Sequence, residues 1–177
     1  TDEIRNVVLL GHGGSGKTSL AEAMAYVSGA TNRMGSVENG NTISDFDKEE
    51  QKRKFSLSTS LIPIEWEKAK INILDTPGYF DFVGEVEEAV SAADAAVIVV
   101  SGKAGVQVGT EKAWELCDKY NLPRMVYVTE MDMERQRVYA QGLDKYLKEM
   151  DAKGETVYED RVDKDGNPVK MAVGPLV

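Results

Sequence analysis

Short apolar runs alternate along the chain with segments whose hydrophobic residues recur at helical spacing. The apolar runs have the length and composition of strands buried on both faces of a sheet, and they lie at 4–10, 70–74, 95–100 and 124–129. The helical patterns lie at 17–28, 83–93, 110–120 and 134–150. This alternation predicts an α/β fold, a three-layer sandwich with a mostly parallel sheet and helices on both faces. Ligands of such sheets bind at the carboxyl ends of the strands.

Two neighbouring segments depart from this alternation. Residues 30–54 are polar, rich in Gly, Asn and Asp, and closed by a charged stretch, which predicts a long mobile loop with some helical character. Residues 55–62 alternate between polar and apolar at period two. We expect them to form a pair of strands with 70–74.

The pattern weakens after Asp151. Lys164-Asp165-Gly166-Asn167 is typical of a hairpin turn, and strands are expected on either side of it, at 156–162 and 168–173. No internal repeat or linker composition divides the sequence. We therefore assign residues 1–177 to one domain.

Composition and charge narrow the classes of function. A formal net charge of −9 excludes a surface that holds nucleic acid by neutralising phosphates over the whole domain, so we expect no direct DNA binding. The longest apolar run, 95–100, is too short to span a membrane, and the acidic N-terminus does not resemble a signal peptide. The single cysteine, Cys117, cannot form an intrachain disulfide. These features predict a soluble cytoplasmic domain without membrane partners, with a monomer as the default state.

The segment between the first strand and the first helix matches the phosphate-binding pattern G-x-x-x-x-G-K-[ST] at every fixed position. Glycines allow successive backbone N–H groups to point at a phosphate, and the helix start adds the positive end of its dipole. Lys17 supplies charge to the outer phosphates, which makes it a candidate catalytic residue, and the Thr18 hydroxyl is a candidate Mg²⁺ ligand. The expected binding set is Gly11, His12, Gly13, Gly14, Ser15, Gly16, Lys17, Thr18 and Ser19.

His12, the only histidine, lies inside this loop. It could act in acid–base catalysis or simply fill the loop. The second interpretation is favoured because such loops act through their backbone and their lysine.

A second motif, Asp75-Thr76-Pro77-Gly78, directly follows the apolar run at 70–74. A carboxylate at the end of such a strand can hold Mg²⁺ through water, and the Gly78 N–H can reach a γ-phosphate. The motif alone is only moderately specific, because turns favour these residue types. Its pairing with the upstream loop predicts nucleotide binding by all four residues, with Asp75 on the metal and Gly78 in the catalytic set.

Three stretches of sequence occur together with these motifs. They are Gly11-His12-Gly13, then Asp75 to Gly78 continued by Tyr79-Phe80-Asp81-Phe82, and then Ala104-Gly105-Val106-Gln107 with Thr110, Glu111 and Trp114. Together they resemble the translational GTPases, and the elongation factor G branch with its paralogues is the most similar. The resemblance runs from about Asn6 to Asp132. It implies a GTPase domain that binds GTP, GDP and Mg²⁺ and is slow until the ribosome, its implied partner, triggers hydrolysis during translocation.

The resemblance also assigns residues that differ from the family pattern. The family has Arg-Gly-Ile-Thr before the second strand, and its Thr completes the Mg²⁺ shell. The matching run here is Arg53-Lys54-Phe55-Ser56, so Ser56 takes that role, unless it faces solvent on a strand. The family also has a His that positions the attacking water, where this chain has Tyr79. A phenol can hydrogen-bond water without being a comparable base, so Tyr79 is a candidate catalytic residue, with packing or slow hydrolysis as alternatives.

Guanine selection in the family uses Asn-Lys-x-Asp after the fifth strand. The matching residues here are Thr129-Glu130-Met131-Asp132. Asp132 can still accept hydrogen bonds from guanine N–H groups, and Thr129 replaces the Asn in part. Glu130 lacks the long cationic stem that covers the purine face. We expect guanine preference with weakened affinity.

Three functions are consistent with the sequence. The first is a Mg²⁺-dependent GTPase of a translation elongation factor. The second is a paralogue that binds GTP, and occupies ribosomes or signals by nucleotide state, with little hydrolysis. A transporter-type ATP-dependent protein leaves Asp132 and the segment at 104–107 unexplained. The family carries an inserted subdomain after the long helix, and 151–177 is expected to be its start, which leaves the domain incomplete at the C-terminus.

Overall fold

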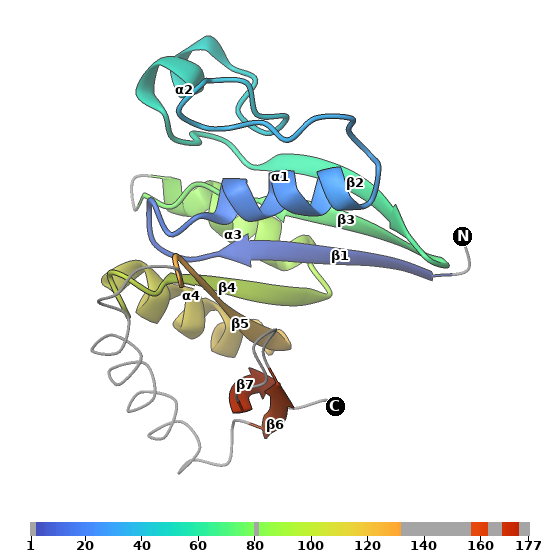
Figure 1. The fold of residues 1–177 in the computed structure, drawn as a ribbon. Coiled ribbons are helices and arrows are strands. Elements are labelled where there is room, and N and C mark those ends of the chain that lie inside the picture. The colour runs from blue at the N-terminus through green and yellow to red at the C-terminus, as the bar shows by residue number, and fades with distance from the viewer. Residues whose placement is uncertain (1–2, 80–81, 132–156, 163–167, 174–177) are drawn as a thin grey trace.

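A computed structural model describes residues 3–79, 82–131, 157–162 and 168–173 (Figure 1). Its helices are α1 (Lys17–Val27), α2 (Lys48–Arg53), α3 (Val83–Ala92) and α4 (Val108–Lys119). Its strands are β1 (Glu3–Leu10), β2 (Ser60–Trp66), β3 (Ala69–Asp75), β4 (Ala95–Ser101), β5 (Arg124–Thr129), β6 (Val157–Val162) and β7 (Pro168–Val173).

The described strands form one sheet in the order β2-β3-β1-β4-β5-β7-β6. Its four central strands, β3, β1, β4 and β5, are parallel, so their carboxyl ends meet at one edge. The strands outside them are antiparallel to their neighbours, β2 on one side and the β7–β6 pair on the other. The predicted α/β class with a mostly parallel sheet is confirmed.

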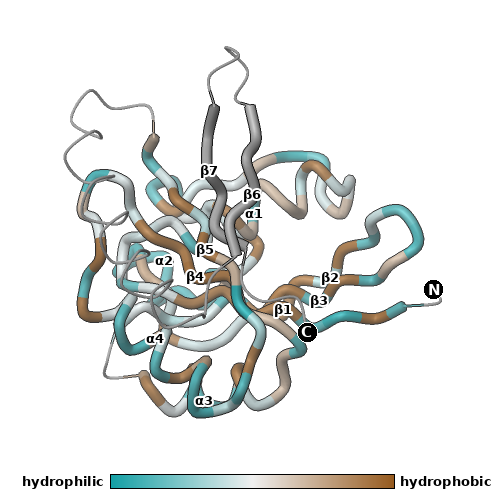
Figure 2. The backbone as a smooth tube through the Cα atoms, turned by 90° about the horizontal axis from the view of Figure 1, so that it is seen from below, coloured by the Kyte–Doolittle hydropathy of each residue, from teal (hydrophilic) through white to brown (hydrophobic). Residues whose placement is uncertain are grey.

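Helices cover both faces of this sheet, as Figure 1 shows. On one face α1 packs through Ala21 and Ala25 against a cluster that includes Leu9 and Ile73. On the other face α3 and α4 contribute to a second cluster, built on residues that include Ile98. Because successive residues of a strand point to opposite faces, β1 and β4 supply both clusters, which explains their uninterrupted apolar runs. In Figure 2 the hydrophobic colour accordingly follows the central strands, while the turn between β2 and β3 is hydrophilic.

One predicted strand begins in a different place. The period-two pattern predicts a strand over 55–62, whereas β2 spans Ser60–Trp66. The backbone N–H groups of Leu57 and Ser58 donate to the Glu50 carboxylate and therefore leave the ladder. Residues 57–59 thus bond to side chains and backbone of α2 and α3 rather than to a neighbouring strand.

The other predicted elements agree with the structure to within a few residues where it describes them. The strands expected at 156–162 and 168–173 correspond to β6 and β7. The predicted helix at 134–150 and the turn at 164–167 lie outside the described residues. In the part of the chain that is described, no helix has the length and apolar character needed to cross a membrane.

Candidate nucleotide-binding site

The phosphate loop joins the end of β1 to the start of α1 and depends on glycine at particular positions. Gly11, Gly14 and Gly16 have φ angles of 138°, 79° and 94°, which residues with a Cβ rarely adopt. A Cβ on Gly11 would lie 2.3 Å from the Val99 carbonyl oxygen of β4. At Gly11 the loop therefore lies directly against β4, where only a residue without a Cβ fits.

The side chain of Lys17, the first residue of α1, reaches back to this loop. Its ammonium donates hydrogen bonds to the carbonyl oxygens of Gly11 and His12, both at 3.0 Å. Burial lowers the pKa of Lys17 to about 8, and the nearby Asp75 carboxylate partly offsets that effect. A bound polyphosphate would favour the charged form and would therefore raise the pKa of Lys17 again.

The second predicted motif follows β3 and touches the phosphate loop. The Thr76 hydroxyl donates to the Leu9 carbonyl of β1 at 2.6 Å, which fixes the turn to the neighbouring strand. A Cβ on Gly78 would lie 2.6 Å from Gly13 Cα and from Lys17 Nζ. Gly78 thus lies directly against the loop, as a residue that contacts an outer phosphate requires.

Asp75 is completely buried at the end of β3. Burial raises the pKa of Asp75 to about 6, while the Thr18 hydroxyl and the Lys17 ammonium act in the opposite direction. Although these groups are close enough to influence its pKa, neither Asp75 oxygen makes a hydrogen bond of good geometry among the described residues. The ionised form of a buried carboxylate without such partners is unfavourable unless another group, such as a hydrated cation, pairs with its charge.

Ser56 lies beside Thr18 and not on a solvent-facing strand. The two hydroxyl oxygens are 3.3 Å apart, and the Ser56 hydroxyl donates to Asp45 at 2.6 Å. Asp45 is itself buried, and its pKa is raised by burial and by the nearby Glu50 and Glu22 carboxylates. Sequence reasoning missed Asp45, because it lies in a polar loop without a recognisable motif.

These groups fit a magnesium ion. Thr18, Ser56 and Asp75 offer the oxygen ligands that Mg²⁺ prefers, and Asp75 has unused acceptor capacity. Among the described residues, no group of three or more His, Cys, Asp or Glu side chains is arranged to hold a metal. A cation site here therefore depends on the two hydroxyls as much as on the carboxylate.

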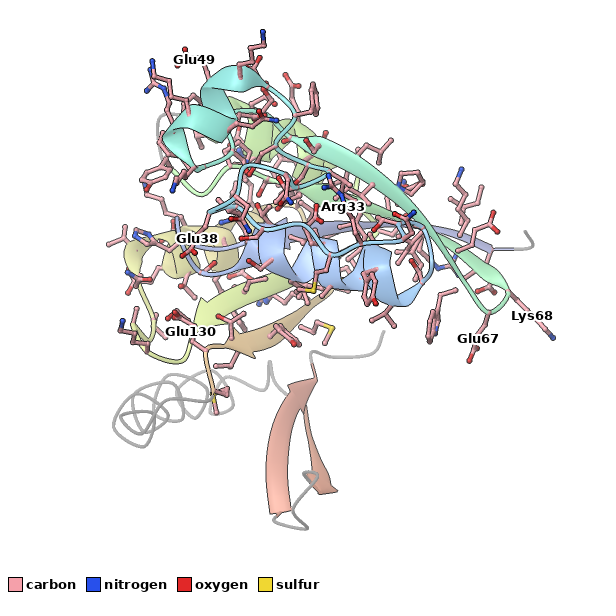
Figure 3. All side chains as sticks on the ribbon, turned by 45° about the horizontal axis from the view of Figure 1, so that its top comes forward. Arg33, Glu38, Glu49, Glu67, Lys68 and Glu130 are labelled. Carbon is pink, nitrogen blue, oxygen red and sulfur yellow. The ribbon has the colours of Figure 1, made fainter. Side chains whose placement is uncertain are left out.

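The segment between α1 and β2 passes over the site and contains α2. In Figure 3, Arg33 and Glu38 lie on the part of this segment that passes over α1, and Glu49 lies on α2. A capping box between Asp47 and Glu50 starts α2. The helix α2 has only six residues, and the rest of the segment is loop. This agrees with the prediction of a long loop with some helical character.

Tyr79 lies above the phosphate loop. Its ring atoms would be 3.1 Å from a Cβ on Gly13, and its ring centroid is 4.7 Å from that of Phe55. The side chain is 45% exposed. The phenol is thus near the outer end of the loop, and its water-orienting role stays a prediction beside the observed packing on Phe55.

The strand β5 closes the other side of the site. The Thr129 hydroxyl donates to the Ser15 carbonyl at 2.7 Å and so connects β5 to the phosphate loop. Glu130 has a left-handed backbone, with φ of 54°, and its carboxylate accepts a hydrogen bond from Ser101. The Ser101–Glu130 pair was not predicted. Asp132, the candidate guanine-binding residue, lies outside the described residues.

These segments line one solvent-open cavity of about 1040 Å³. Its lining comes from the phosphate loop, the turn after β3, the segment between α1 and β2, and the end of β5. Its volume slightly exceeds the roughly 300–1,000 Å³ typical of small-molecule sites. Lys17, Thr18, Ser56 and Tyr79 all line it, whereas His12 packs against Gly109 at the start of α4.

The sequence profile of one family, described as the elongation factor Tu GTP binding domain, matches residues 2–172. The chain belongs to this family of GTP-binding domains. The expected membership of the translational GTPase family, as a GTP-binding domain, is confirmed by this match.

This GTP-binding domain is similar to parts of longer proteins. It is 39% identical over 154 residues to mitochondrial ribosome-releasing factor 2 of Anopheles gambiae, which is 87% of the chain and 20% of the relative. It is 40% identical over 129 residues to elongation factor G 2 of Borreliella burgdorferi, which is 73% of the chain and 19% of the relative. The domain thus spans about a fifth of the length of these curated relatives.

Solved structures share the fold of the GTP-binding domain. A protein from Thermus thermophilus superposes with a TM-score of 0.74 at 36% identity, over 98% of this chain and 28% of that one. Translation elongation factor SelB from Methanococcus maripaludis, in complex with the GTP analogue GppNHp, superposes with a TM-score of 0.62 at 20% identity. That match covers 84% of this chain and 26% of the other, and it supports the fold alone.

Proposed function

We propose that this domain binds GTP with Mg²⁺ and hydrolyses it as the G domain of a ribosome-dependent translocation factor of the elongation factor G type. One observation carries the proposal: Lys17, Thr18 and Ser56 line the same cavity. They come from the phosphate loop and from the segment that passes over it, and Asp75 lies buried beside them. The names of the relatives, elongation factor G 2 and ribosome-releasing factor 2, support a role on the ribosome.

Binding of the triphosphate would use the backbone N–H groups of residues 13–18 and the charge of Lys17. Gly78 lies against Gly13 and Lys17, and its N–H would donate to the outermost phosphate. Thr18, Ser56 and Asp75 would hold a magnesium ion, which neutralises charge on the outer phosphates.

Hydrolysis would proceed by in-line attack of water on the γ-phosphate, with cleavage of its bond to the β-phosphate oxygen and release of GDP and inorganic phosphate. Lys17 would stabilise the charge that develops on the departing oxygen. Tyr79, half exposed above Gly13, would orient the water through its phenol. Since one exposed side chain holds a water only loosely, turnover by the isolated domain should be slow.

A paralogue that binds GTP with little turnover is the second candidate. The observation that favours it is the packing of Tyr79 on Phe55, which could hold the phenol away from the water. The relatives carry names for two ribosomal activities, and they come from bacteria and from mitochondria. We propose a bacterial-type cytoplasmic factor, with a mitochondrial one as the alternative.

Phosphate release from GTP, measured with and without ribosomes, tests this function. The full-length protein is required, because the domain spans about a fifth of its relatives. We expect slow intrinsic turnover and strong stimulation by ribosomes, with both abolished by Lys17→Ala. Binding of GTP without stimulated turnover would support the low-turnover paralogue. Equal turnover of ATP would contradict the proposal.

A further inference from the structure

Residues 42–46, between α1 and α2, bury their polar side chains and expose their apolar ones. Thr42, Ser44 and Asp45 are buried, whereas Ile43 and Phe46 are 38% and 75% exposed. Soluble proteins usually show the opposite preference. Burial of apolar surface therefore does not hold these residues in place, and polar contacts must do so.

Glu22 on α1 supplies the central contacts. Its side chain is completely buried. One carboxylate oxygen, Oε2, accepts a hydrogen bond from the Gly35 N–H at 2.8 Å, and the other, Oε1, accepts from the Ile43 N–H. Hydrogen bonds to an ionised acceptor are among the stronger ones in proteins. A single carboxylate thus joins both ends of the segment 35–43 to α1.

Gly35 is suited to this contact. A Cβ at this position would lie 2.6 Å from Glu22 Oε2 and 2.6 Å from the Asn41 carbonyl oxygen. Any larger residue would push the segment away from the carboxylate. A substitution of either Gly35 or Glu22 is therefore expected to disrupt this contact.

The tethered segment continues directly into the metal-binding groups. Asp45, two residues after Ile43, accepts the Ser56 hydroxyl at 2.6 Å, and Ser56 lies 3.3 Å from the Thr18 hydroxyl. The Ser44 carbonyl accepts from the Ser60 hydroxyl at 2.6 Å, which connects the segment to β2. The positions of Asp45 and Ser56 thus depend on the part of the chain that Glu22 holds.

We propose that Glu22 is a positioning residue that holds the segment 35–45 so that Ser56 stays beside Thr18, and that it thereby sets the Mg²⁺ dependence of GTP binding. Glu22 does not line the cavity, so it acts through the segment and not on the nucleotide. The proposed effect on Mg²⁺ dependence rests on the proposed function of the domain. The tether itself stands on the hydrogen bonds alone.

Two substitutions break the tether from opposite sides. Glu22→Gln keeps the size of the side chain, but one acceptor becomes an NH₂ donor, so only one of the two N–H groups can be satisfied. Gly35→Ala places a Cβ against the carboxylate. Asp94→Asn is the matched control, because Asp94 also accepts a backbone N–H, that of Asn6 at 2.7 Å, without contacting this segment.

The first measurement is trypsin cleavage after Arg33 in the nucleotide-free chain. Arg33 is exposed and lies two residues before Gly35. We expect cleavage about tenfold faster in both tether variants, which corresponds to about 1.4 kcal/mol, and unchanged in Asp94→Asn. A cooperative thermal transition in each variant shows that it remains folded.

The second measurement is a Mg²⁺ titration of GTP binding. The Mg²⁺ concentration at half-maximal effect should rise about tenfold in Glu22→Gln, while GTP affinity without Mg²⁺ stays at the wild-type value. Wild-type cleavage rates in both tether variants would overturn the tether. An equal loss of GTP affinity with and without Mg²⁺ would overturn the positioning role. If the wild-type chain itself binds no GTP, the proposed function fails, and the cleavage rates still decide for or against the tether.

Discussion

Gly78→Ala gives the sharpest steric perturbation of the site. A Cβ there would lie 2.6 Å from the backbone N and Cα of Gly13 and from Lys17 Nζ. The end of the lysine side chain can move aside, whereas the Gly13 atoms belong to the backbone and yield less easily. Overpacking of this kind costs about 1–3 kcal/mol. If the cost falls on the contact between Gly78 and an outer phosphate, the affinity for GTP drops by about 5- to 150-fold.

GDP has no γ-phosphate to contact Gly78, so its affinity should change little. Titration of fluorescent GTP and GDP with Mg²⁺ therefore should show a loss of GTP affinity alone, together with slower hydrolysis. Gly84→Ala is the control, because Gly84 lies in α3, where a Cβ would meet no atom of the described residues within 4 Å and alanine favours helix. An unchanged ratio of GTP to GDP affinity in Gly78→Ala would refute the reasoning.

Two further predictions concern buried titratable groups. Cys117 is buried and its pKa is raised to about 11, chiefly by burial, so at pH 8 the thiol is neutral and should react with a disulfide reagent only after denaturation; rapid reaction of the native domain would contradict this. The pKa of Asp75, about 6 in the folded nucleotide-free domain against an ordinary 3.8, means that folding favours its protonated form. The Asp75 contribution to stability is then present below about pH 4 and is lost as pH rises to about 6, by up to about 3 kcal/mol. Denaturant unfolding without Mg²⁺ should show a decline over this range that is larger in the wild type than in Asp75→Asn, and parallel pH profiles would contradict it.

The central fold follows from the sequence because its signals are local. Val97 to Val100 are buried on both faces of the sheet, so an uninterrupted apolar run was sufficient to identify β4. The phosphate loop likewise carries its geometry in its glycines, since φ angles such as that of Gly16 require them. Motif spacing alone was therefore sufficient to predict that one site contains Lys17, Thr18, Asp75 and Gly78.

The remaining parts of the site depend on contacts between distant segments. The start of β2 was misplaced because Glu50 takes the N–H groups of Leu57 and Ser58, a contact that periodicity does not show. Asp45 and Glu22 were missed for the same reason, since their burial arises only when the loop folds over α1. Ser56 was predicted as a Mg²⁺ ligand through the family resemblance; its hydroxyl lies beside that of Thr18, and its role on the metal stays a prediction.

The most direct test of the account is the affinity of this chain for fluorescent GTP, GDP and ATP with and without Mg²⁺, in the wild type, Ser56→Ala and Ser56→Thr. We predict guanine-selective binding, with a Mg²⁺ dependence for GTP that Ser56→Ala weakens and Ser56→Thr preserves, because only the hydroxyl is needed beside Thr18. Equal binding of guanine and adenine nucleotides, or GTP binding that is indifferent to Mg²⁺ and to Ser56, would contradict the account.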